Sequence, residues 1–534
     1  MTQPNFLFIT TDQQRADHLG CYGNSIVKTP AIDGLAARGT LFEQFYATCP
    51  ICMPNRIAIL TGRMPTVNST RLNGIPLSKD AVTFVDILRA GGYHTGLVGK
   101  SHLQSITGRE ANLPSSATNR TGTEPPDDLN EAHRERREGP EYEAELMPLW
   151  RENPNRKEPE LPYYGFDHVR FANGHSDHVQ GHYTGWLNSH SDNSDALRGR
   201  DNALPSSDIV APQAWRTAVP EELYPTAYIA DESCHFIDQH LSTRADSPFF
   251  LHCSFTDPHH PFTPPGKYFD MYQPDDIPLP ESFHDRDPHE PPLLTRLREE
   301  FKNGKASNEG PIPFCASEEQ TRQIIALTYG MITCIDDAIA RLLAHLETKG
   351  VLDNTVVIFS SDHGDFMGDH GIMLKHGLHY NGVIRVPFIV ADPQRPEPVR
   401  TQLHGTSIDT GAVILARAGL APYNGFQGID ITAVQNGELN TPRRGILIEE
   451  DALADHLEQE DGVRVRSYIE DNWRLTLWDG VEQGELFDLN SDPQEVNNLW
   501  SQTEYSHKRA QLTEAMLREM MRLNDTAPIA MHVA

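Results

Sequence analysis

The stretch Cys52-Met53-Pro54-Asn55-Arg56 places a thiol one helical turn ahead of an arginine. A predicted strand and loop precede it, so we expect a helix to begin at about Cys52. On that helix the side chains of Cys52 and Arg56, at positions i and i+4, share one face. Because helix N-termini also favour anions, a nucleophile beside a fixed positive charge at this point suits attack on an anionic ester. The alternative for an isolated cysteine is a buried and inert side chain.

Two other groups of polar residues come directly after apolar runs that are typical of strands. The run 6–11 is followed by Asp12, and the run 356–361 is followed by Asp362-His363. Open α/β sheets bind ligands at the carboxyl ends of their strands, so these side chains can meet at one edge of a sheet. Two carboxylates with an imidazole suit a divalent cation. Taken singly, each aspartate would serve only as a helix cap or a turn residue.

The elements that must position these residues alternate between strand and helix as far as about residue 430. The patterns predict helices at 31–39, 80–90 and 317–349, and further strands at 93–98, 248–255 and 386–390. This alternation predicts an α/β fold with a largely parallel sheet and helices on both faces.

The chain changes character after residue 435. Short strands are predicted at 445–448, 463–469, 473–478 and 484–488, followed by a helix at 504–523. We therefore expect a catalytic α/β domain over 1–435 and a small domain over 436–534 with an antiparallel sheet and a covering helix. Within the first domain, the Pro- and charge-rich stretches at about 104–165 and 264–315 are predicted to be polar surface insertions.

The 534 residues carry 45 Lys and Arg against 75 Asp and Glu, a net charge of −30. A field of this sign repels polyanions, which argues against nucleic acid and anionic membranes as partners. An acidic protein that acts on an anionic ester then needs a locally positive pocket. No stretch approaches the ~18 apolar residues of a membrane span, and the N-terminus has no signal-peptide pattern.

The seven cysteines are scattered and have no CxxC spacing, so we expect no disulfides, no zinc–thiolate site and a cytoplasmic protein. A histidine-rich passage lies between the two insertions: His168, His175, His178 and His182. We interpret these side chains as loop histidines at the rim of a pocket rather than as a second metal site.

Taken together, these motifs resemble those of the type I sulfatases of the alkaline phosphatase superfamily. Cys52-x-Pro54-x-Arg56, followed by Thr61-Gly62, matches the family signature, in which the cysteine is oxidised after translation to formylglycine, an aldehyde that hydrates to a gem-diol. The other matching residues follow in the family order: Asp12-Gln13, Asn73-Gly74, Gly99-Lys100-Ser101-His102-Leu103, Pro258-His259-His260-Pro261, Asp362-His363-Gly364-Asp365, Lys375 with Arg385-Val386-Pro387, and Glu485-Leu486-Phe487-Asp488-Leu489. The resemblance implies an alkaline-phosphatase-like large mixed sheet sandwiched by helices, with a small C-terminal antiparallel sheet and a helix.

The resemblance also implies roles for individual residues. The catalytic set is Cys52, Arg56, Lys100, His102, His259 and Lys375, and the substrate-binding set is Asn73, Lys100, His259 and Lys375. The implied metal ligands are Asp12, Gln13, Cys52 (as formylglycine), Asp362 and His363. Arg56, Lys100 and Lys375 would supply the positive pocket, and a protonated His259 would add to it.

In the implied mechanism, a metal-held hydroxyl of the gem-diol attacks sulfur in line and forms a covalent sulfo-enzyme. His259 acts as general acid for the leaving alcohol or phenol, and the second hydroxyl loses its proton to His102 and ejects sulfate. We therefore expect hydrolysis of aryl or alkyl sulfate monoesters, small molecules, by a sulfuric ester hydrolase. A formylglycine-generating enzyme would be the maturation partner, and we expect a homo-oligomer, a dimer or a tetramer, in which the apolar tail 527–534 could dock.

Two departures from the family pattern leave alternatives open. Asp12-Gln13 and Asp362-His363 are closer to choline sulfatases and phosphonate monoester hydrolases, and a nitrogen ligand favours Mn²⁺ over Ca²⁺ as the single divalent cation. A phosphonate monoester or phosphodiester hydrolase on the same scaffold is therefore the main alternative, although Lys100 and His102 match sulfatases. The remote alternative is a non-catalytic anion-binding protein in which Cys52 stays a thiol. Asn381, where the family carries Glu, has no explanation in the sequence.

Overall fold

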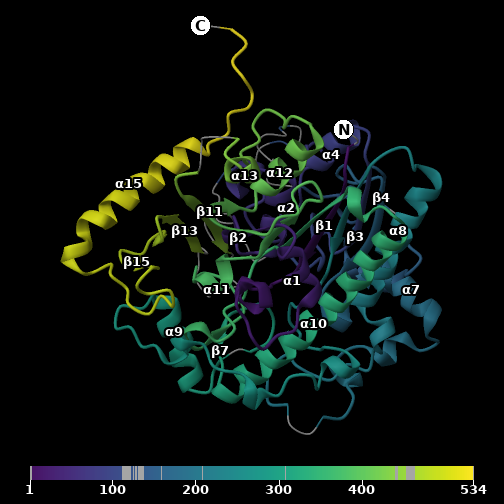
Figure 1. Cartoon of the computed structure of the whole chain (residues 1–534). Helices are drawn as coiled ribbons and strands as arrows, with labels where there is room; N and C mark the ends of the chain where they lie inside the picture. The colour runs from purple at the N-terminus through teal and green to yellow at the C-terminus, as the bar shows by residue number, and fades with distance from the viewer. Residues whose placement is uncertain are drawn as a thin grey trace.

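The computed structural model describes residues 3–110, 122–123, 126, 129, 137–157, 159–206, 209–306, 308–438, 443–452 and 463–532. In this part of the chain one large sheet has the strand order β11-β2-β10-β8-β1-β6-β3-β4-β5 (Figure 1). Its strands are β1 (Asn5–Thr11), β2 (Thr40–Tyr46), β3 (His94–Gly99), β4 (His168–Asn173), β5 (Gln180–Gly181), β6 (Phe249–Ser254), β8 (Thr355–Ser361), β10 (Phe388–Ala391) and β11 (Val399–Thr406).

The centre of the sheet is parallel. Strand β1 pairs with β8 and β6 on its two sides, and Thr11 lies opposite Ser361. All residues of these three strands are buried, as continuous apolar runs in parallel sheets usually are. Strand β10 runs antiparallel to both β8 and β2, and β5 runs antiparallel to β4. The sheet is therefore mixed, which confirms the fold class that the family resemblance implied.

Alternate residues of β1 divide the core into two layers. Leu7 and Ile9 pack on one face of the sheet and Phe6 and Phe8 on the other. The helices of the first face are α1 (Pro30–Ala36), α7 (His182–His190), α8 (Pro225–Thr243) and α10 (Glu318–Thr348) (Figure 1). The second face is covered by α2 (Cys52–Thr61), α4 (Phe84–Ala90) and α12 (Asp409–Ala418).

The long helix α10 begins at a capping box, in which the side chains of Ser317 and Gln320 each bond to the other residue's backbone N–H. It is long and apolar enough to cross a membrane by length and composition alone. However, 83% of its most apolar window is buried inside the protein, where it forms part of the first-face core. Its apolar character is thus explained by packing.

The C-terminal region forms a four-stranded antiparallel sheet in the order β12-β13-β14-β15. The strands are β12 (Ile446–Ala452), β13 (Val463–Glu470), β14 (Trp473–Trp478) and β15 (Glu485–Asp488), and helix α15 (Ser506–Arg522) packs against them. The small antiparallel sheet with a helix is confirmed, and the boundary between 435 and 436 stays a prediction.

The two polar insertions contain regular structure that composition alone did not predict. Helix α6 (Met147–Glu152) lies in the first insertion, and α9 (Pro292–Lys302) and β7 (Phe314–Cys315) lie in the second. Residues 111–121, 124–125, 127–128, 130–136 and 158 of the first insertion, and residue 307 of the second, lie outside the described residues.

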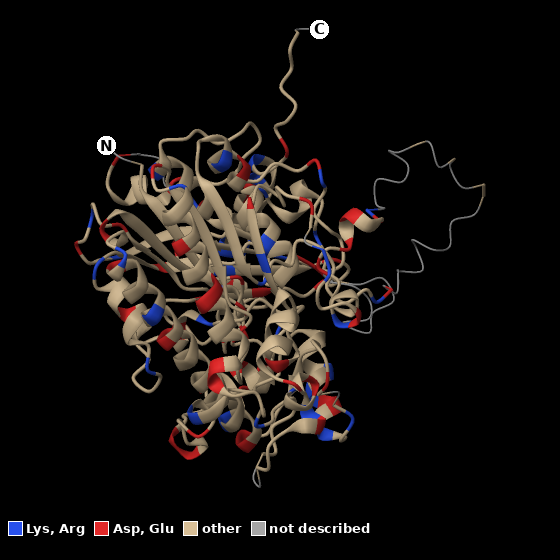
Figure 2. Ribbon diagram, turned by 90° about the vertical axis from the view of Figure 1, so that its right-hand side faces the viewer, with Lys and Arg blue, Asp and Glu red and all other residues tan. Residues whose placement is uncertain are grey.

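The remaining α-helices and strands are α3 (Pro65–Asn68), β9 (Ile372–Met373), α11 (Asn381–Ile384) and α13 (Ile431–Gln435). Charged residues gather mainly on the outer helices and loops, and the strands of the large sheet carry few of them (Figure 2).

Candidate active site

The carboxyl ends of β1 and β8 and the N-terminus of α2 meet at one point. Because β1 and β8 are parallel and in register, Asp12 and Asp362-His363 leave the same edge of the sheet. Cys52 is the first residue of α2, and its Sγ lies 3.1 Å from His363 Nε2 and 3.8 Å from Asp12 Oδ1. Lys375 Nζ lies 3.3 Å from the same sulfur. Five residues from distant parts of the chain therefore converge, and the strand ends meet as the sequence predicted.

Helix α2 is built to present position 52. Pro54 lies in the first turn, where a missing N–H is harmless. Asn55 Oδ1 accepts from Thr48 N at 3.1 Å, and its Nδ2 donates to Ser407 Oγ at 3.0 Å. The helix ends at Gly62, whose φ of 60° is left-handed and whose missing side chain leaves room for the ring of Phe426. The Thr-Gly part of the motif is thus explained by the C-terminus of this helix.

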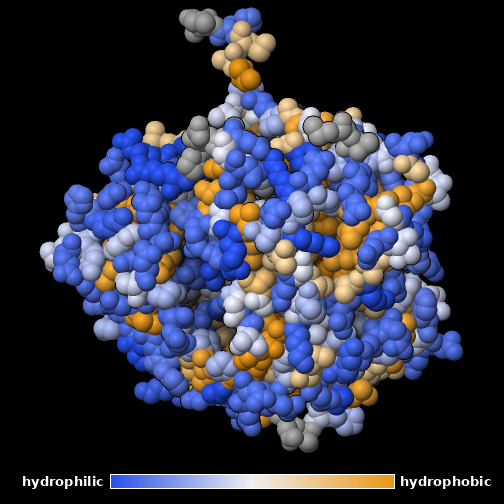
Figure 3. Space-filling view, in the orientation of Figure 1, coloured by the Kyte–Doolittle hydropathy of each residue, from blue (hydrophilic) through white to orange (hydrophobic). Residues whose placement is uncertain are grey.

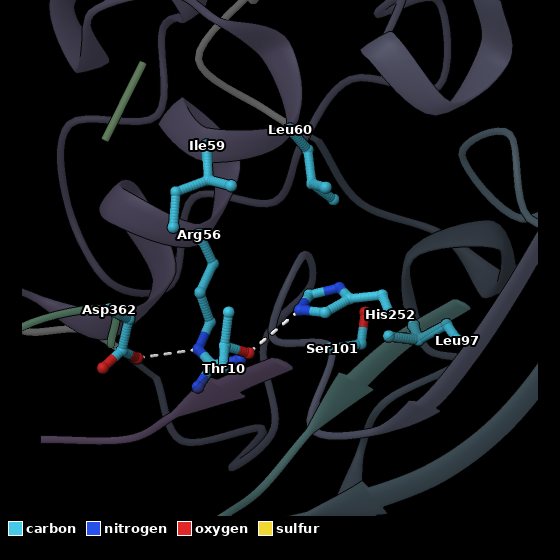
Figure 4. A pocket seen from close by; sticks show the side chains of 8 residues that line it. All are labelled: Thr10, Arg56, Ile59, Leu60, Leu97, Ser101, His252 and Asp362. Carbon is cyan, nitrogen blue, oxygen red and sulfur yellow. Dashed lines mark hydrogen bonds and ion pairs between the residues drawn. The ribbon is translucent and has the colours of Figure 1, made fainter. Parts of the chain in front are cut away.

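Arg56 joins the two aspartates beneath the site. Its Nε donates to Asp362 Oδ2 at 2.8 Å, and its Nη2 lies 3.6 Å from Asp12 Oδ2. Its Nη1 donates to Ser254 Oγ and to the carbonyl of Lys100. Figure 4 shows Arg56 beside Asp362 at a small cavity of about 10 Å³, with His252 bonded to Thr10 on the other side. Arg56 therefore fixes the carboxylates as well as adding positive charge.

The residues at this point fit a divalent cation. One ligand atom each from Asp12, Cys52, Asp362 and His363 lie within 4.8 Å of one another, and all four residues are buried. His363 Nδ1 donates to the carbonyl of Gly364 at 2.9 Å, which leaves the Nε2 lone pair facing the cluster, as in metal-ligating histidines. Burial lowers the pKa of His363, but Asp362 outweighs it and raises this pKa, so the carboxylates favour a positive charge here. Carboxylate oxygens with one nitrogen are a donor set that suits a divalent cation.

The side-chain amide of Gln13, the remaining implied metal ligand, forms hydrogen bonds with other side chains of the protein. Its Oε1 accepts from Lys375 Nζ at 2.7 Å, and its Nε2 donates to Asp365. Its backbone has a φ of 64° and its N–H donates to Asp362 Oδ1. Its assignment as a metal ligand stays a prediction.

Two buried lysines face the sulfur of Cys52. Burial raises the pKa of the thiol, but Lys100 and Lys375 outweigh it and hold this pKa well below its ordinary value. In the same way Lys100 and Arg56 outweigh burial and hold the pKa of Asp12 well below its ordinary value. The positive pocket that an acidic protein needs for an anionic ester therefore lies at residue 52.

His259 and His102 lie on the same site. His259 Nε2 is 2.9 Å from Lys375 Nζ, and its Nδ1 donates to the carbonyl of His260 at 2.6 Å. Burial, then the neighbouring His175 and His260, lower the pKa of His259 well below its ordinary value, so the protonated form expected from the sequence is disfavoured. Burial also lowers the pKa of His102, opposed by its contact with the Cys52 thiol. A neutral His102 has the lone pair that a base requires.

His175 is the site residue whose position the sequence left vague. Its Nε2 lies 2.8 Å from Lys100 Nζ, and its ring stacks on His259 with centroids 3.5 Å apart. Together with Asp12 and His259 it forms a second group of side chains that could hold a metal ion. The ammonium of Lys100 contacts both Asp12 and His175, so a protein cation already lies at this group. The other three histidines of the passage pack elsewhere, against Phe236, Trp215 and Trp150.

Glu145 was not predicted from the sequence. It lies in the first insertion, fully buried, and accepts from the backbone N–H groups of His102, Leu103 and Gln104 at 2.6, 3.0 and 3.2 Å. Tyr163 donates to it as well, at 2.6 Å. Because His102 has a φ of 58°, this carboxylate fixes a backbone conformation that non-glycine residues rarely adopt. A glutamate among many in a polar stretch gives no local signal for this contact.

The structure also shows the contacts of Asn73 and Asn381, two asparagines that the sequence analysis singled out. Asn73 Oδ1 accepts from the N–H of Met53 at 3.2 Å, which places Asn73 against the first turn of α2. The N–H of Asn381 donates to Glu495 Oε2 at 2.7 Å, so a carboxylate from the C-terminal region reaches the position where the resemblance led us to expect Glu.

Comparisons with known proteins agree with this geometry. The family model described as sulfatase matches residues 4–420, and the model described as N-sulphoglucosamine sulphohydrolase, C-terminal, matches residues 368–522. An arylsulfatase of Clostridium perfringens is 27% identical over 97% of this chain and 94% of its own length. A choline-sulfatase of Rhizobium meliloti is 23% identical over 93% of this chain and 82% of its own length. The crystal structure of a phosphonate monoester hydrolase of Agrobacterium radiobacter shares the fold, with a TM-score of 0.75, 23% identity and coverage of 98% of this chain and 96% of that chain.

Proposed function

The chain belongs to the sulfatase family, and from this premise we propose how its residues hydrolyse a sulfate monoester. It is a sulfuric ester hydrolase of the alkaline phosphatase superfamily with a sulfate ester as substrate. The observation that carries the mechanism is the position of residue 52, at a helix N-terminus with Lys375 Nζ at 3.3 Å and with Lys100 lowering the pKa of its thiol. A nucleophile in these surroundings can approach a group that already bears negative oxygens.

The reacting form of residue 52 is formylglycine, produced from the Cys52 thiol by a formylglycine-generating enzyme. Sγ then marks where a hydroxyl oxygen of the hydrated aldehyde lies. The complete Cys-x-Pro-x-Arg motif supports this assignment. So does the position of His102, a buried neutral imidazole in contact with the side chain of residue 52, which suits it to take a proton from that side chain.

Asp12, Asp362, His363 and residue 52 would hold the divalent cation, which as a Lewis acid would withdraw electrons from the oxygens that it binds. We favour Mn²⁺ over Ca²⁺ because of the imidazole of His363. Lys100 and Lys375 bind and orient the sulfate oxygens on either side of residue 52. Arg56 keeps the two carboxylates in place from below.

His259 and Lys375 act together on the leaving group. Lys375 Nζ donates to His259 Nε2, so a neutral His259 has a proton source 2.9 Å away when the departing alkoxide or phenoxide requires one. The stacked ring of His175 limits rotation of His259 and leaves it facing the site. General acid catalysis of this kind contributes about 10²–10⁴-fold in rate.

Hydrolysis of phosphonate monoesters or phosphodiesters is the second candidate. The observation that favours it is His363 in the cation cluster, since the resemblance assigns an Asp-His pair to phosphonate monoester hydrolases. Lys100 and His102 favour sulfate, and both lie in the site.

We also propose a cytoplasmic homo-oligomer, a dimer or a tetramer. All seven cysteines are free, which is compatible with a reducing compartment. The face seen in Figure 3 is mainly hydrophilic, but the C-terminal segment extends away from the body of the molecule (Figures 1 and 3). On this segment and on α15, large apolar side chains are exposed, including Met521 at 72% and Met531 at 82%. A contact between subunits would cover these side chains.

The test compares kcat/KM for an aryl sulfate and the matching aryl phosphonate, with mass spectrometry of the peptide that contains residue 52. We expect the higher kcat/KM on the sulfate, loss of activity with a chelator and its return with Mn²⁺, and a residue 52 that has lost its sulfur. A higher kcat/KM on the phosphonate would reverse the assignment of substrate. A residue 52 that alkylates as a thiol in a preparation without turnover would favour the non-catalytic anion-binding alternative.

A further inference from the structure

The backbone around Lys375 adopts an unfavourable conformation that contacts with the rest of the protein must stabilise. Leu374 has a φ of 71° and His376 a φ of 99°, so the lysine is flanked by two non-glycine residues in the left-handed region. Such conformations persist only where the surrounding structure fixes them, because each raises the free energy of the folded chain. The side chain of Lys375 is also fully buried, and its Nζ contacts Gln13, Cys52 and His259.

The N-terminal side of this segment is fixed by the catalytic α/β unit. Asp365 Oδ1 accepts from the N–H of Leu374 at 2.8 Å and from that of Met367 at 2.8 Å. Asp365 is the last residue of the Asp362-His363-Gly364-Asp365 motif that follows β8. This anchor accounts for Leu374 but not for His376.

The C-terminal side is fixed by Glu450 of β12, in the small sheet. Its Oε1 accepts from the N–H of Gly377 at 2.9 Å and lies 3.3 Å from His376 Nδ1. Its Oε2 lies 3.1 Å from His379 Nε2. Glu450 has no exposed surface, and its position is the middle of β12, opposite Val465 of β13. One carboxylate thus binds three residues of the five that follow Lys375.

The neighbouring strands extend the same contact. His379 Nδ1 lies 2.8 Å from Ser467 Oγ on β13, and Trp478 Nε1 on β14 donates to the carbonyl of Gly377 at 2.8 Å. Three adjacent strands of the small sheet therefore each contribute one side chain to the segment 376–379. The matched C-terminal family region also begins at 368, ahead of Lys375, which groups this segment with the small sheet.

We propose that Glu450 is a positioning residue for Lys375, and that the C-terminal sheet is the template on which the active-site lysine is held. The inference rests on the proposed function, because it is Lys375 that binds the sulfate group there. Without the carboxylate, the backbone at His376 relaxes toward negative φ and Nζ moves away from residue 52. A displacement of about 1 Å at a catalytic group can lower the rate about 10²-fold.

The decisive variant is Glu450→Gln, and Glu449→Gln is its matched control. Glu449 is the adjacent residue of the same strand, is 6% exposed and contacts Thr66 and Arg466 instead of the segment 376–379. We expect Glu450→Gln to lower kcat for an aryl sulfate at least about ten-fold and to raise KM, because the displaced Lys375 also holds the sulfate group less tightly, and Glu449→Gln to leave both within about two-fold of the wild type. The two variants should lose similar amounts of thermal stability, measured as Tm.

A double-variant cycle with Lys375→Met separates positioning from a general loss of structure. If Glu450 acts through Lys375, Glu450→Gln produces no further loss of kcat in the Lys375→Met background. Losses that multiply, or a Glu450→Gln variant with kcat within about two-fold of the wild type, would overturn the inference. If Glu450→Gln is insoluble, Trp478→Phe removes one contact from the same segment, and a kcat unchanged by it would count against the template.

Binding of inorganic sulfate, measured by calorimetry, gives a readout that does not depend on turnover. We expect wild type and Glu449→Gln to bind sulfate alike, and Glu450→Gln to bind it at least about ten-fold more weakly. A wild type that binds sulfate but hydrolyses no sulfate ester would contradict the proposed function and leave this inference standing. A wild type that hydrolyses the ester beside a Glu450→Gln variant equal to it in both measurements would contradict this inference alone.

Discussion

At the scale of single residues, each cation of the site has its own oxygen partner. Arg56 binds Asp362, Lys100 binds Asp12, and Lys375 binds Gln13 through its amide oxygen. These pairs let three basic side chains stay buried within a few ångströms of one another, because buried charges require partners. The net charge of −30 therefore coexists with a positive pocket at residue 52.

His259 is the residue whose substitution should depend most on the substrate. We expect His259→Ala to lower kcat/KM by about 10²–10⁴ for alkyl sulfates and weakly acidic phenols, because those leaving groups need a proton. For a nitrophenyl sulfate, whose phenoxide leaves unprotonated, the loss should be less than about ten-fold. A series of substituted phenyl sulfates measures this as a steeper dependence of rate on leaving-group pKa. His178→Ala, a histidine that packs on Trp215, is the control, and parallel losses across the series would remove the acid function from His259.

The same scale shows what the sequence could and could not predict. Asp12, Asp362 and Cys52 were predictable because each stands at the end of a strand or the start of a helix, where local patterns are informative. Glu145 lies 43 residues from the His102 N–H that it binds, and Glu450 lies 73 residues from the Gly377 N–H. Contacts between residues this far apart in the sequence leave no local pattern. The sequence therefore predicted which strand ends and which helix start meet at residue 52, but it did not predict Glu145 and Glu450.

At the scale of elements, central strands were predicted well and peripheral ones poorly. Strand β8 reads as an apolar β-branched run and is buried throughout, whereas β11 alternates exposed and buried residues and carries a bulge between Thr401 and His404. Strand β2 was also missed, since its Glu43 and Gln44 interrupt the apolar pattern. Helix α9 was hidden in a Pro-rich stretch because only its inner residues Leu294 and Leu297 are buried. A partly exposed strand or helix is stabilised by the residues that pack against it. Those residues come from distant parts of the chain, so the local sequence does not reveal the element.

Strand β4 offers a test of a partly buried histidine, His168. His168 packs its ring on Phe236 of α8, and its Nε2 has no hydrogen-bond partner among the described residues. Burial, then Arg170 and His94, lower the pKa of His168 to about 4. The folded state therefore favours neutral His168, and its contribution to stability is complete above the ordinary pKa of 6.5 and is lost as the pH falls toward 4.

We expect His168→Phe to make the protein less sensitive to acid. Between pH 7 and pH 5 the wild type should lose about 2 kcal/mol of unfolding free energy through His168 that the variant does not lose. Urea unfolding at the two pH values measures the difference. His190→Phe, on the exposed end of α7, is the control and should follow the wild type. Equal losses in wild type and His168→Phe would show that this histidine is not held neutral.

At the scale of the whole molecule, the small sheet shares apolar clusters with helix α2 and with the chain around α11, beside the large sheet. Val465, Trp478 and Phe487 pack in one cluster with Leu378 and Val383, and Leu447, Leu475 and Leu486 pack in another with Ala58 and Met64. Arg474 of β14 is fully buried between Glu485 and Glu495. These two glutamates also accept from the hydroxyl of Tyr380 and the N–H of Asn381, on the loop that follows Lys375. The sequence boundary at 435 therefore separates two patterns of strand, while packing and charge cross it.

Cooperative unfolding is the consequence. We expect one calorimetric transition in which activity and the structure of the small sheet are lost together. An intermediate in which only one part is folded would expose the apolar surface that the two parts share. Arg474→Met leaves two buried carboxylates without their cation and should lower the unfolding free energy by about 3–5 kcal/mol, with the single transition moving as a whole. Arg518→Met removes an exposed pair with Glu514 and should change it by less than about 0.5 kcal/mol. A separate low-temperature transition in Arg474→Met, with activity surviving above it, would mean that the catalytic unit folds without the small sheet, and the template for Lys375 would then be dispensable.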